Sequence, residues 1–140
     1  MVDNTPPRKA SGVTWDRIIG SDGTVKKIVH DTTSTKYGTT CDNPENGDEY
    51  EFYVFGCKGA TKLSMWYYKG PDAGTWDLYI NDQLDSSGYD EYSSSYDYAF
   101  REIDLTEDVP DGVVKFTMKV NGKNASSSGY ALYIRNWVVS

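Results

Sequence analysis

The sequence predicts an all-β protein, a two-sheet antiparallel sandwich of the jelly-roll type with about eight strands. Two observations favour this fold. Several short segments alternate apolar and polar residues with a period of two, which a strand with one buried face requires. Clusters of Gly, Pro, Asn, Asp and Ser separate these segments every 8–14 residues, as turns do. No segment repeats apolar residues at the spacing of an amphipathic helix over three turns.

Eight segments carry the strand signal. The first two flank the turn cluster at 20–23 and are expected to form a hairpin, with Trp15 as an anchor. A loop rich in Thr, Ser, Asn and Gly is expected at 31–47, before the third strand. The expected strands are residues 13–19, 24–30, 50–55, 61–68, 74–82, 99–105, 114–120 and 130–139.

The segment 74–82 illustrates the alternation. Trp76, Leu78 and Ile80 fall on one side of the expected strand, so they are predicted to lie in the core. The residues that follow, 85–98, combine tyrosine with Ser, Asp and Gly. That segment is too polar for a core and too aromatic for an ordinary linker, so we predict a tyrosine-rich loop.

The chain of 140 residues has the length of a single domain. Residues 1–11 are polar and include Pro6-Pro7, which predicts a flexible arm; an arm that docks on a partner is the alternative. Residues 12–140 are then predicted to form one β-sandwich domain.

Cys41 and Cys57 are the only cysteines. They flank a predicted strand of about nine residues, which would span roughly 30 Å. The Cα atoms of a disulfide lie within about 7 Å of each other. Two buried free thiols are therefore favoured over a disulfide, which would require the loop at 41–47 to fold back along the strand.

Charge and composition argue against several classes of function. The net charge is −7 and the longest basic run is Lys26-Lys27, so we expect neither nucleic-acid binding nor attraction to an anionic membrane. No apolar run approaches the roughly 20 residues of a membrane span. The first residues lead into no apolar segment, so no signal peptide is expected.

Motifs that carry catalytic chemistry are sparse. His30 is the only histidine and lies at an expected strand end, and no Gly-x-Ser-x-Gly elbow or phosphate-binding glycine loop occurs. We therefore expect that the protein is not an enzyme. The alternative to this expectation is a small hydrolase that uses two of the 21 Asp and Glu residues. Their spacing in the sequence does not single out a catalytic pair.

The order of motifs from residue 47 to residue 139 resembles a known family. The motifs are Gly47-Asp48, Gly74-Thr75-Trp76, Tyr79-Ile80-Asn81-Asp82, Asp111-Gly112, Asn121-Gly122-Lys123-Asn124 and Ser128-Gly129-Tyr130. In this order they resemble the galactose-binding-like β-sandwich of many carbohydrate-binding modules. Similar sandwiches occur in phage tail, fibre and capsid-decorating proteins. The resemblance implies a binding function without catalysis.

Sugar recognition needs an aromatic ring against the C–H face of a pyranose and planar polar groups at its hydroxyls. The predicted ligand-binding residues are Trp66, Tyr68, Asn81, Asp82, Tyr89, Asp90, Tyr92, Tyr96, Tyr98, Asn124 and Arg135. A loop rich in Tyr and Ser is equally typical of protein-binding surfaces.

A structural Ca²⁺ site is a further hypothesis. Asp82, Asp85 and Asp90, with Glu91, supply the oxygen ligands that this ion takes. Their spacing is not that of an EF-hand, and a solvated acidic loop is the alternative.

Two functions therefore compete. The first is a carbohydrate-binding module that recognises a glycan and attaches a larger extracellular or cell-surface assembly to it. The second is a virion structural protein, a capsid-decoration, tail or fibre domain, that acts through protein partners and forms a homo-oligomer.

Overall fold

The structure is a computed structural model that describes residues 8–32 and 36–140. These residues form twelve strands and no helix. The strands are β1 (Ala10–Gly12), β2 (Arg17–Ile19), β3 (Val25–Lys26), β4 (Ile28–Thr32), β5 (Tyr37–Cys41), β6 (Glu49–Phe55), β7 (Lys62–Lys69), β8 (Thr75–Ile80), β9 (Gln83–Asp90), β10 (Asp97–Asp104), β11 (Val113–Val120) and β12 (Tyr133–Val139).

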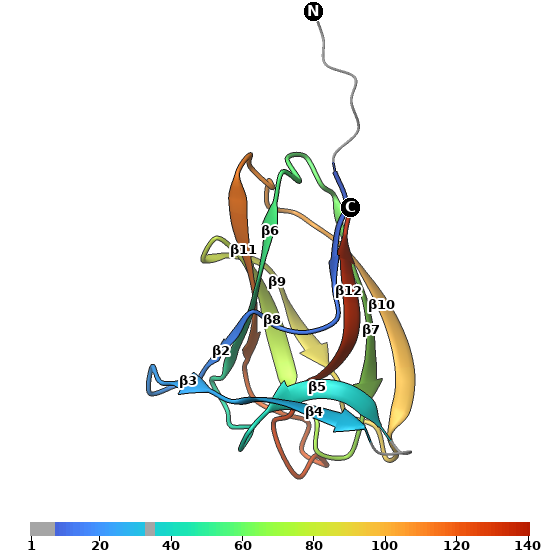
Figure 1. The fold of residues 1–140 in the computed structure, drawn as a ribbon. Coiled ribbons are helices and arrows are strands. Elements are labelled where there is room, and N and C mark those ends of the chain that lie inside the picture. The colour runs from blue at the N-terminus through green and yellow to red at the C-terminus, as the bar shows by residue number, and fades with distance from the viewer. Residues whose placement is uncertain (1–7, 33–35) are drawn as a thin grey trace, which may run out of the picture.

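The strands form two sheets that face each other as layers (Figure 1). Sheet A has the order β10-β7-β12-β5-β4, and β1 pairs with β12. Sheet B has the order β3-β2-β6-β11-β8-β9. The named strands pair antiparallel throughout. The predicted fold class, a two-sheet antiparallel sandwich, is confirmed.

An aromatic stack joins the two sheets through the core. Phe52 of β6 in sheet B lies 4.1 Å from Trp137 of β12 in sheet A, measured between ring centroids. A second aromatic neighbour of Phe52 is Phe116 of β11, at 5.2 Å between ring centroids. Trp15 packs 6.3 Å from Phe52, and its indole N–H donates to the carbonyl of Thr39 at 3.3 Å. Aromatic pairs in such contact stabilise a fold beyond the area that they bury.

The core contains the residues expected from the best alternating segment. Trp76, Leu78 and Ile80 are all buried, as predicted. Cys41 and Cys57 are also buried and are not bonded to each other, in agreement with the favoured interpretation.

The predicted strand at 24–30 divides between the two sheets. Its first part is β3, which pairs with β2 in the expected hairpin of sheet B. Its last part belongs to β4, which crosses into sheet A and pairs with β5. The loop predicted at 31–47 contains β5, which the sequence did not reveal because its Gly and Thr residues give no apolar alternation.

The predicted tyrosine-rich loop at 85–98 is also partly strand. β9 spans Gln83–Asp90 and forms a hairpin with β8. Asn81 and Asp82 make the turn with positive φ angles of 48° and 66°, as a two-residue hairpin favours. β9 lies at the edge of sheet B and is largely exposed, so it lacks the alternation that marks a half-buried strand.

The predicted arm at 1–11 is described only from residue 8 onward. Residues 1–7 lie outside the described residues, so the prediction for them stays a prediction. Ala10 belongs to β1 and pairs with Val139 near the C-terminus. Gly12, in the same strand, lies against the Trp137 ring, where a Cβ atom would come within 2.5 Å of the indole.

Replacing Phe52 with alanine should lower the free energy of unfolding by about 3–5 kcal/mol, because the substitution removes the contact between the sheets. Phe55 of the same strand is 64% exposed, so Phe55→Ala should change it by only about 0.5 kcal/mol. Urea unfolding of both variants measures this difference. Equal losses would contradict the role assigned to the stack.

Candidate binding surface

The outer face of sheet A carries a row of aromatic side chains. In β7, Leu63, Met65 and Tyr67 point into the core, so Trp66 and Tyr68 point outward. The neighbouring strand β10 places Phe100 opposite Trp66 and Tyr98 opposite Tyr68. The ring centroids are 4.9 Å apart in the first pair and 5.4 Å apart in the second. We call Trp66, Tyr68, Tyr98 and Phe100 the aromatic strip.

The aromatic strip is accessible and has a cation at one end. Tyr98 is 52% exposed and Phe100 is 53% exposed, which is unusual for such large rings. Arg135 lies where a bulge interrupts the pairing of β12 with β7. Its guanidinium carbon is 5.6 Å from the centre of the Tyr98 ring. This surface therefore combines apolar ring faces with a hydrogen-bond donor.

A cleft of about 270 Å³ adjoins the aromatic strip at Arg135. It lies between the N-terminal segment, β4, β5 and β12, and we call it the β4–β5 cleft. Its lining includes Val13, His30, Thr39, Ile134 and Arg135. Nδ1 of His30 lies 2.9 Å from the Thr39 hydroxyl. Sequence reasoning did not find this cleft, because it depends on β5 and on the crossing of β4 into sheet A.

Four of the predicted ligand-binding residues thus lie together on one face: Trp66, Tyr68, Tyr98 and Arg135. Phe100 was missed, since an apolar residue in a predicted strand is ordinarily assigned to the core. The other predicted residues lie elsewhere and have structural contacts.

Three of them belong to the β8–β9 hairpin. The Asn81 side-chain oxygen accepts from the backbone N–H of Lys115 at 2.9 Å, and Asp82 forms an ion pair with the Lys115 ammonium at 2.8 Å. Tyr89 stacks on Trp76 with 4.6 Å between ring centroids. These contacts fix the hairpin to sheet B, away from the aromatic strip.

Three more support the loops at one end of the sandwich. Asp90 accepts from the Tyr92 backbone N–H at 3.0 Å and from the Asn124 amide at 2.9 Å. These hydrogen bonds connect the chain after β9 to the loop between β11 and β12.

Tyr96 belongs to a cluster around Lys36. The Lys36 ammonium donates to the hydroxyls of Tyr96 and Tyr133 at 3.2 and 2.9 Å, and lies over both rings. Burial alone would lower the pKa of Lys36, but hydrogen bonding to Tyr96 and the charges of Asp72 and Asp31 raise it overall. The cluster therefore holds a cation from the chain itself.

The structure does not bring the three proposed calcium ligands together. Asp85 accepts from the backbone N–H groups of Thr106 and Glu107 at 2.7 and 2.8 Å, while Asp82 and Asp90 have the separate contacts given above. Among residues 8–32 and 36–140, no group of three or more His, Cys, Asp or Glu side chains is placed to hold a metal ion.

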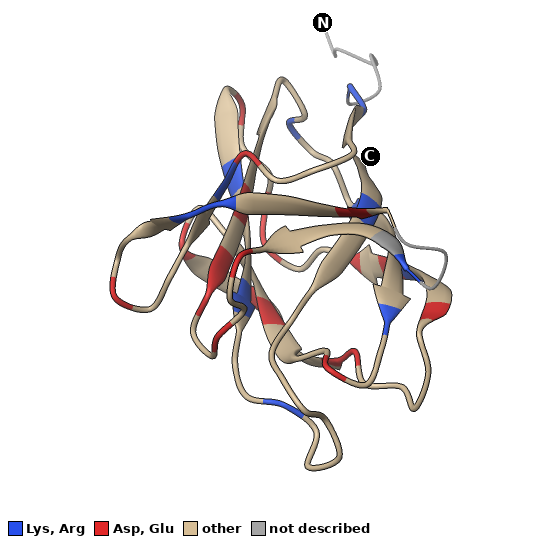
Figure 2. Ribbon diagram, turned by 60° about the horizontal axis from the view of Figure 1, so that its bottom comes forward, with Lys and Arg blue, Asp and Glu red and all other residues tan. Residues whose placement is uncertain are grey.

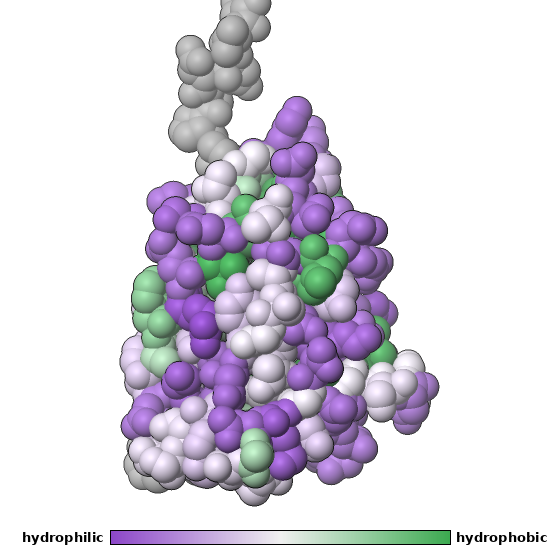
Figure 3. All heavy atoms as spheres, turned by 180° about the vertical axis from the view of Figure 1, so that it is seen from behind, coloured by the Kyte–Doolittle hydropathy of each residue, from purple (hydrophilic) through white to green (hydrophobic). Residues whose placement is uncertain are grey.

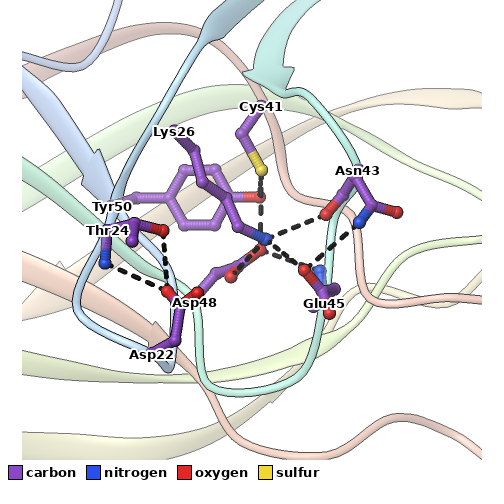
Figure 4. Close-up of polar contacts among 8 residues, drawn as sticks. All are labelled: Asp22, Thr24, Lys26, Cys41, Asn43, Glu45, Asp48 and Tyr50. Atoms are coloured by element: carbon purple, nitrogen blue, oxygen red, sulfur yellow. Dashed lines mark hydrogen bonds and ion pairs between the residues drawn. The ribbon is translucent and has the colours of Figure 1, made fainter.

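A second polar cluster, which is partly buried, lies around Lys26 of β3 (Figure 4). The Lys26 ammonium lies 2.8 Å from the fully buried Asp48 carboxylate and 3.0 Å from Glu45. It also donates to the Asn43 carbonyl at 2.9 Å. Burial lowers the pKa of Lys26, but hydrogen bonds to Asp48 and Glu45 outweigh it and raise the pKa overall. These contacts fix the turn before β6.

Cys41 belongs to the same cluster. Its sulfur lies 3.5 Å from Asp48 and 3.3 Å from the Tyr50 hydroxyl. Burial raises the pKa of the Cys41 thiol to about 11. The thiol is therefore neutral near pH 7 and unsuited to act as a nucleophile. The cluster is a structural element of the fold.

Elsewhere on the described residues, a second hollow of about 440 Å³ is lined by the loops at 58–61 and 105–110, and its lining contains no aromatic ring. Lys and Arg are scattered over the ribbon and do not gather on one face (Figure 2). Seen from behind, the apolar groups form small patches separated by polar ones (Figure 3). In the described part of the chain, no helix is long and apolar enough to cross a membrane.

Comparison with known proteins identifies the fold. No family model and no curated protein matches the sequence. A Paenibacillus xanthan lyase matches 91% of this chain with 21% identity and a TM-score of 0.58, although the chain spans only 13% of that enzyme. A family 35 carbohydrate-binding module from an environmental isolate matches 92% of this chain and 88% of its own, with 12% identity and a TM-score of 0.59.

A CBM35 domain from Cellvibrio japonicus gives a similar result. It matches 95% of this chain and 93% of its own, with 14% identity and a TM-score of 0.56. At these identities the likeness establishes the fold. The chain has the β-sandwich fold of family 35 carbohydrate-binding modules, so the resemblance stated from the sequence is confirmed at the level of fold.

Replacing Lys26 with methionine should lower the free energy of unfolding by about 3–5 kcal/mol, because the substitution leaves the buried Asp48 carboxylate without its cation. Lys62 pairs with Glu102 on the surface, where both side chains are nearly half exposed, so Lys62→Met should cost only about 0–1 kcal/mol. Chemical denaturation of the two variants provides the comparison. A small loss for Lys26→Met would show that the cluster does not anchor the turn.

The Cys41 thiol should also make stability fall in mildly alkaline solution. The unfolded thiol loses its proton near pH 9.0 and the folded one only near pH 11, so the folded state binds more protons in that interval. The neutral thiol therefore makes its full contribution to the free energy of unfolding below pH 9. Above pH 9 this contribution falls by up to about 1.4 kcal/mol per pH unit. Urea midpoints between pH 7.5 and 10 should decline less steeply for Cys41→Ala than for the wild type. If the urea midpoints of the wild type and of Cys41→Ala fell equally with pH, Cys41 would not be the cause of the decline.

Proposed function

We propose that the protein is a non-catalytic carbohydrate-binding module whose ligand lies on the aromatic strip. The observation that carries this proposal is the pairing of four outward aromatic rings on adjacent strands, with Arg135 at one end. The fold shared with family 35 modules supports it. The proposal uses the strip and the fold together, because cross-strand aromatic pairs also occur where they only stabilise a sheet.

The chemistry of the aromatic strip suits a sugar. A pyranose presents C–H groups on one face, which pack against the apolar face of an aromatic ring, and hydroxyls at its edge. Arg135 offers donors to those hydroxyls. Asn136, the next residue of β12, lies opposite Trp66 in the β12–β7 pairing and adds an amide on the same side of the strip as Arg135. The rings project from strands, so little side-chain freedom is lost when a ligand binds.

The contacts around the aromatic strip favour binding over hydrolysis. Glu102 and Asp104 continue β10 beyond Phe100, and both lie within ion-pair distance of Lys62, at 2.6 and 3.5 Å. Both carboxylates thus pair with the same exposed lysine, and we assign neither of them a catalytic role. The protein therefore binds the glycan and leaves it unchanged.

The setting of such a module follows from its ligand. Structural polysaccharides of cell walls and capsules lie outside the cell, and we propose that the protein acts there, as part of a larger assembly that it attaches to a glycan. Self-association and the alternative role in a virion stay predictions. The three structures described above come from carbohydrate-binding modules and from a lyase.

Trp66→Ala and Tyr98→Ala should each weaken polysaccharide binding at least tenfold, about 1.4 kcal/mol, because each removes one stacking ring. Affinity electrophoresis and calorimetry with xanthan, xylan, mannan and a mixed-linkage β-glucan measure this. Tyr53→Ala is the matched control, since Tyr53 is 40% exposed on β6 of the other sheet. Melting temperatures should show that all three variants are folded.

Two results would overturn the proposal. One is that no polysaccharide binds at millimolar concentrations of its repeating unit. The other is that the two strip variants bind as tightly as the Tyr53 control.

A further inference from the structure

We propose that the β4–β5 cleft receives the terminal sugar of the glycan, while the residues that follow it stack along the aromatic strip. This inference rests on the proposed function and specifies that the module recognises chain ends. The alternative is a chain that passes over the strip along its length without entering the cleft.

The size of the β4–β5 cleft suits one sugar residue. Its volume of about 270 Å³ lies below the range of roughly 300–1,000 Å³ that is typical of pockets for drug-sized ligands. Thr39 and Ile134, which line it, are almost completely buried and form its base. Val13 and His30 are exposed and form its rim. A closed base and an open rim fit the end of a chain better than its middle.

One side of the cleft is apolar and fixed in position. Val13 is 68% exposed although it is aliphatic, and it stands at the rim. The next residue, Thr14, accepts a hydrogen bond from the Trp137 indole at 2.9 Å, so the segment is tied to the core stack. The exposed methyl groups of Val13 are thus held where the C–H face of a sugar could pack against them.

The lining of the cleft also offers directed polar groups. The contact between His30 Nδ1 and the Thr39 hydroxyl fixes the orientation of the imidazole ring. Nε2 of His30 makes no hydrogen bond with any described residue. This second nitrogen can therefore donate to or accept from a sugar hydroxyl at the rim. The only histidine of the chain, for which the sequence gave no role, acquires one here.

The cleft and the aromatic strip are continuous through Arg135. This residue lines the cleft, and its guanidinium lies over the Tyr98 ring. Along the strip, the Phe100–Trp66 pair comes first and the Tyr98–Tyr68 pair follows two residues later, roughly 7 Å further on. In the strand register, Arg135 of β12 lies beside Trp66 and Tyr67 of β7, and the cleft lies across β12, where Ile134 pairs with Thr39 of β5. A chain that stacks on the Tyr98–Tyr68 pair therefore reaches the cleft by crossing β12 at Arg135.

The test compares binding capacity with the number of chain ends. The probe is the member of the xanthan, xylan, mannan and β-glucan panel that binds, used intact and after partial hydrolysis to oligosaccharides of about six residues. If the module recognises chain ends, hydrolysis should increase the number of binding sites per gram of glycan. Calorimetry should show this number rising in proportion to the number of chain ends. Capacity that depends only on the mass of polysaccharide would overturn the inference.

Variants of the cleft give an independent measurement. His30→Ala and Val13→Ser should each weaken binding of the six-residue oligosaccharide about fivefold or more, whereas Val25→Ser, at an equally exposed valine of β3, should leave it unchanged. If both cleft variants bind as the wild type while Trp66→Ala is weakened, the chain-end inference fails and the proposed function stands. If Trp66→Ala does not weaken binding, or if no probe binds, the proposed function and the chain-end inference both fail.

Discussion

The contact between Phe52 and Trp137 is the interaction on which the rest of the molecule depends. It joins β6 of sheet B to β12 of sheet A across the core, at 4.1 Å. The Trp137 ring also packs on Gly12, and its indole N–H donates a hydrogen bond to the Thr14 carbonyl. One side chain thus fixes the last strand, the N-terminal segment and the distance between the sheets. The bulge that exposes Arg135 lies in the same strand.

The parts of this fold that could be predicted from the sequence are those with one buried and one exposed face. The segment around Trp76, Leu78 and Ile80 lies between β11 and β9 in sheet B with one face in the core, and its apolar alternation reflects that burial. β5 and β9 show no such alternation of apolar and polar residues. Hydrogen bonds to a partner strand stabilise them more than apolar burial does. The division of 24–30 between two sheets depends on contacts far away in the sequence, which no local pattern contains.

The candidate surface was only partly predictable for a related reason. Residue type indicated Trp66, Tyr68 and Tyr98, but it indicated Tyr89 and Tyr96 equally well. Strand register decides between these groups, since a shift of one residue moves a side chain to the other face of a sheet. Tyr89 packs against Trp76 and Tyr96 against Lys36, so they support the fold.

The buried carboxylates stabilise the fold, whereas the aromatic strip is the proposed binding surface. Asp48 and Asp85 are buried, and each holds a backbone group or a lysine of the chain itself. Withdrawing these carboxylates from solvent is costly unless such partners are present, so they are unavailable to a ligand. The strip carries mostly apolar ring surface, and a neutral sugar can cover it without desolvating a carboxylate. A protein with a net charge of −7 can therefore bind an uncharged glycan through stacking and a few hydrogen bonds on a rigid sheet.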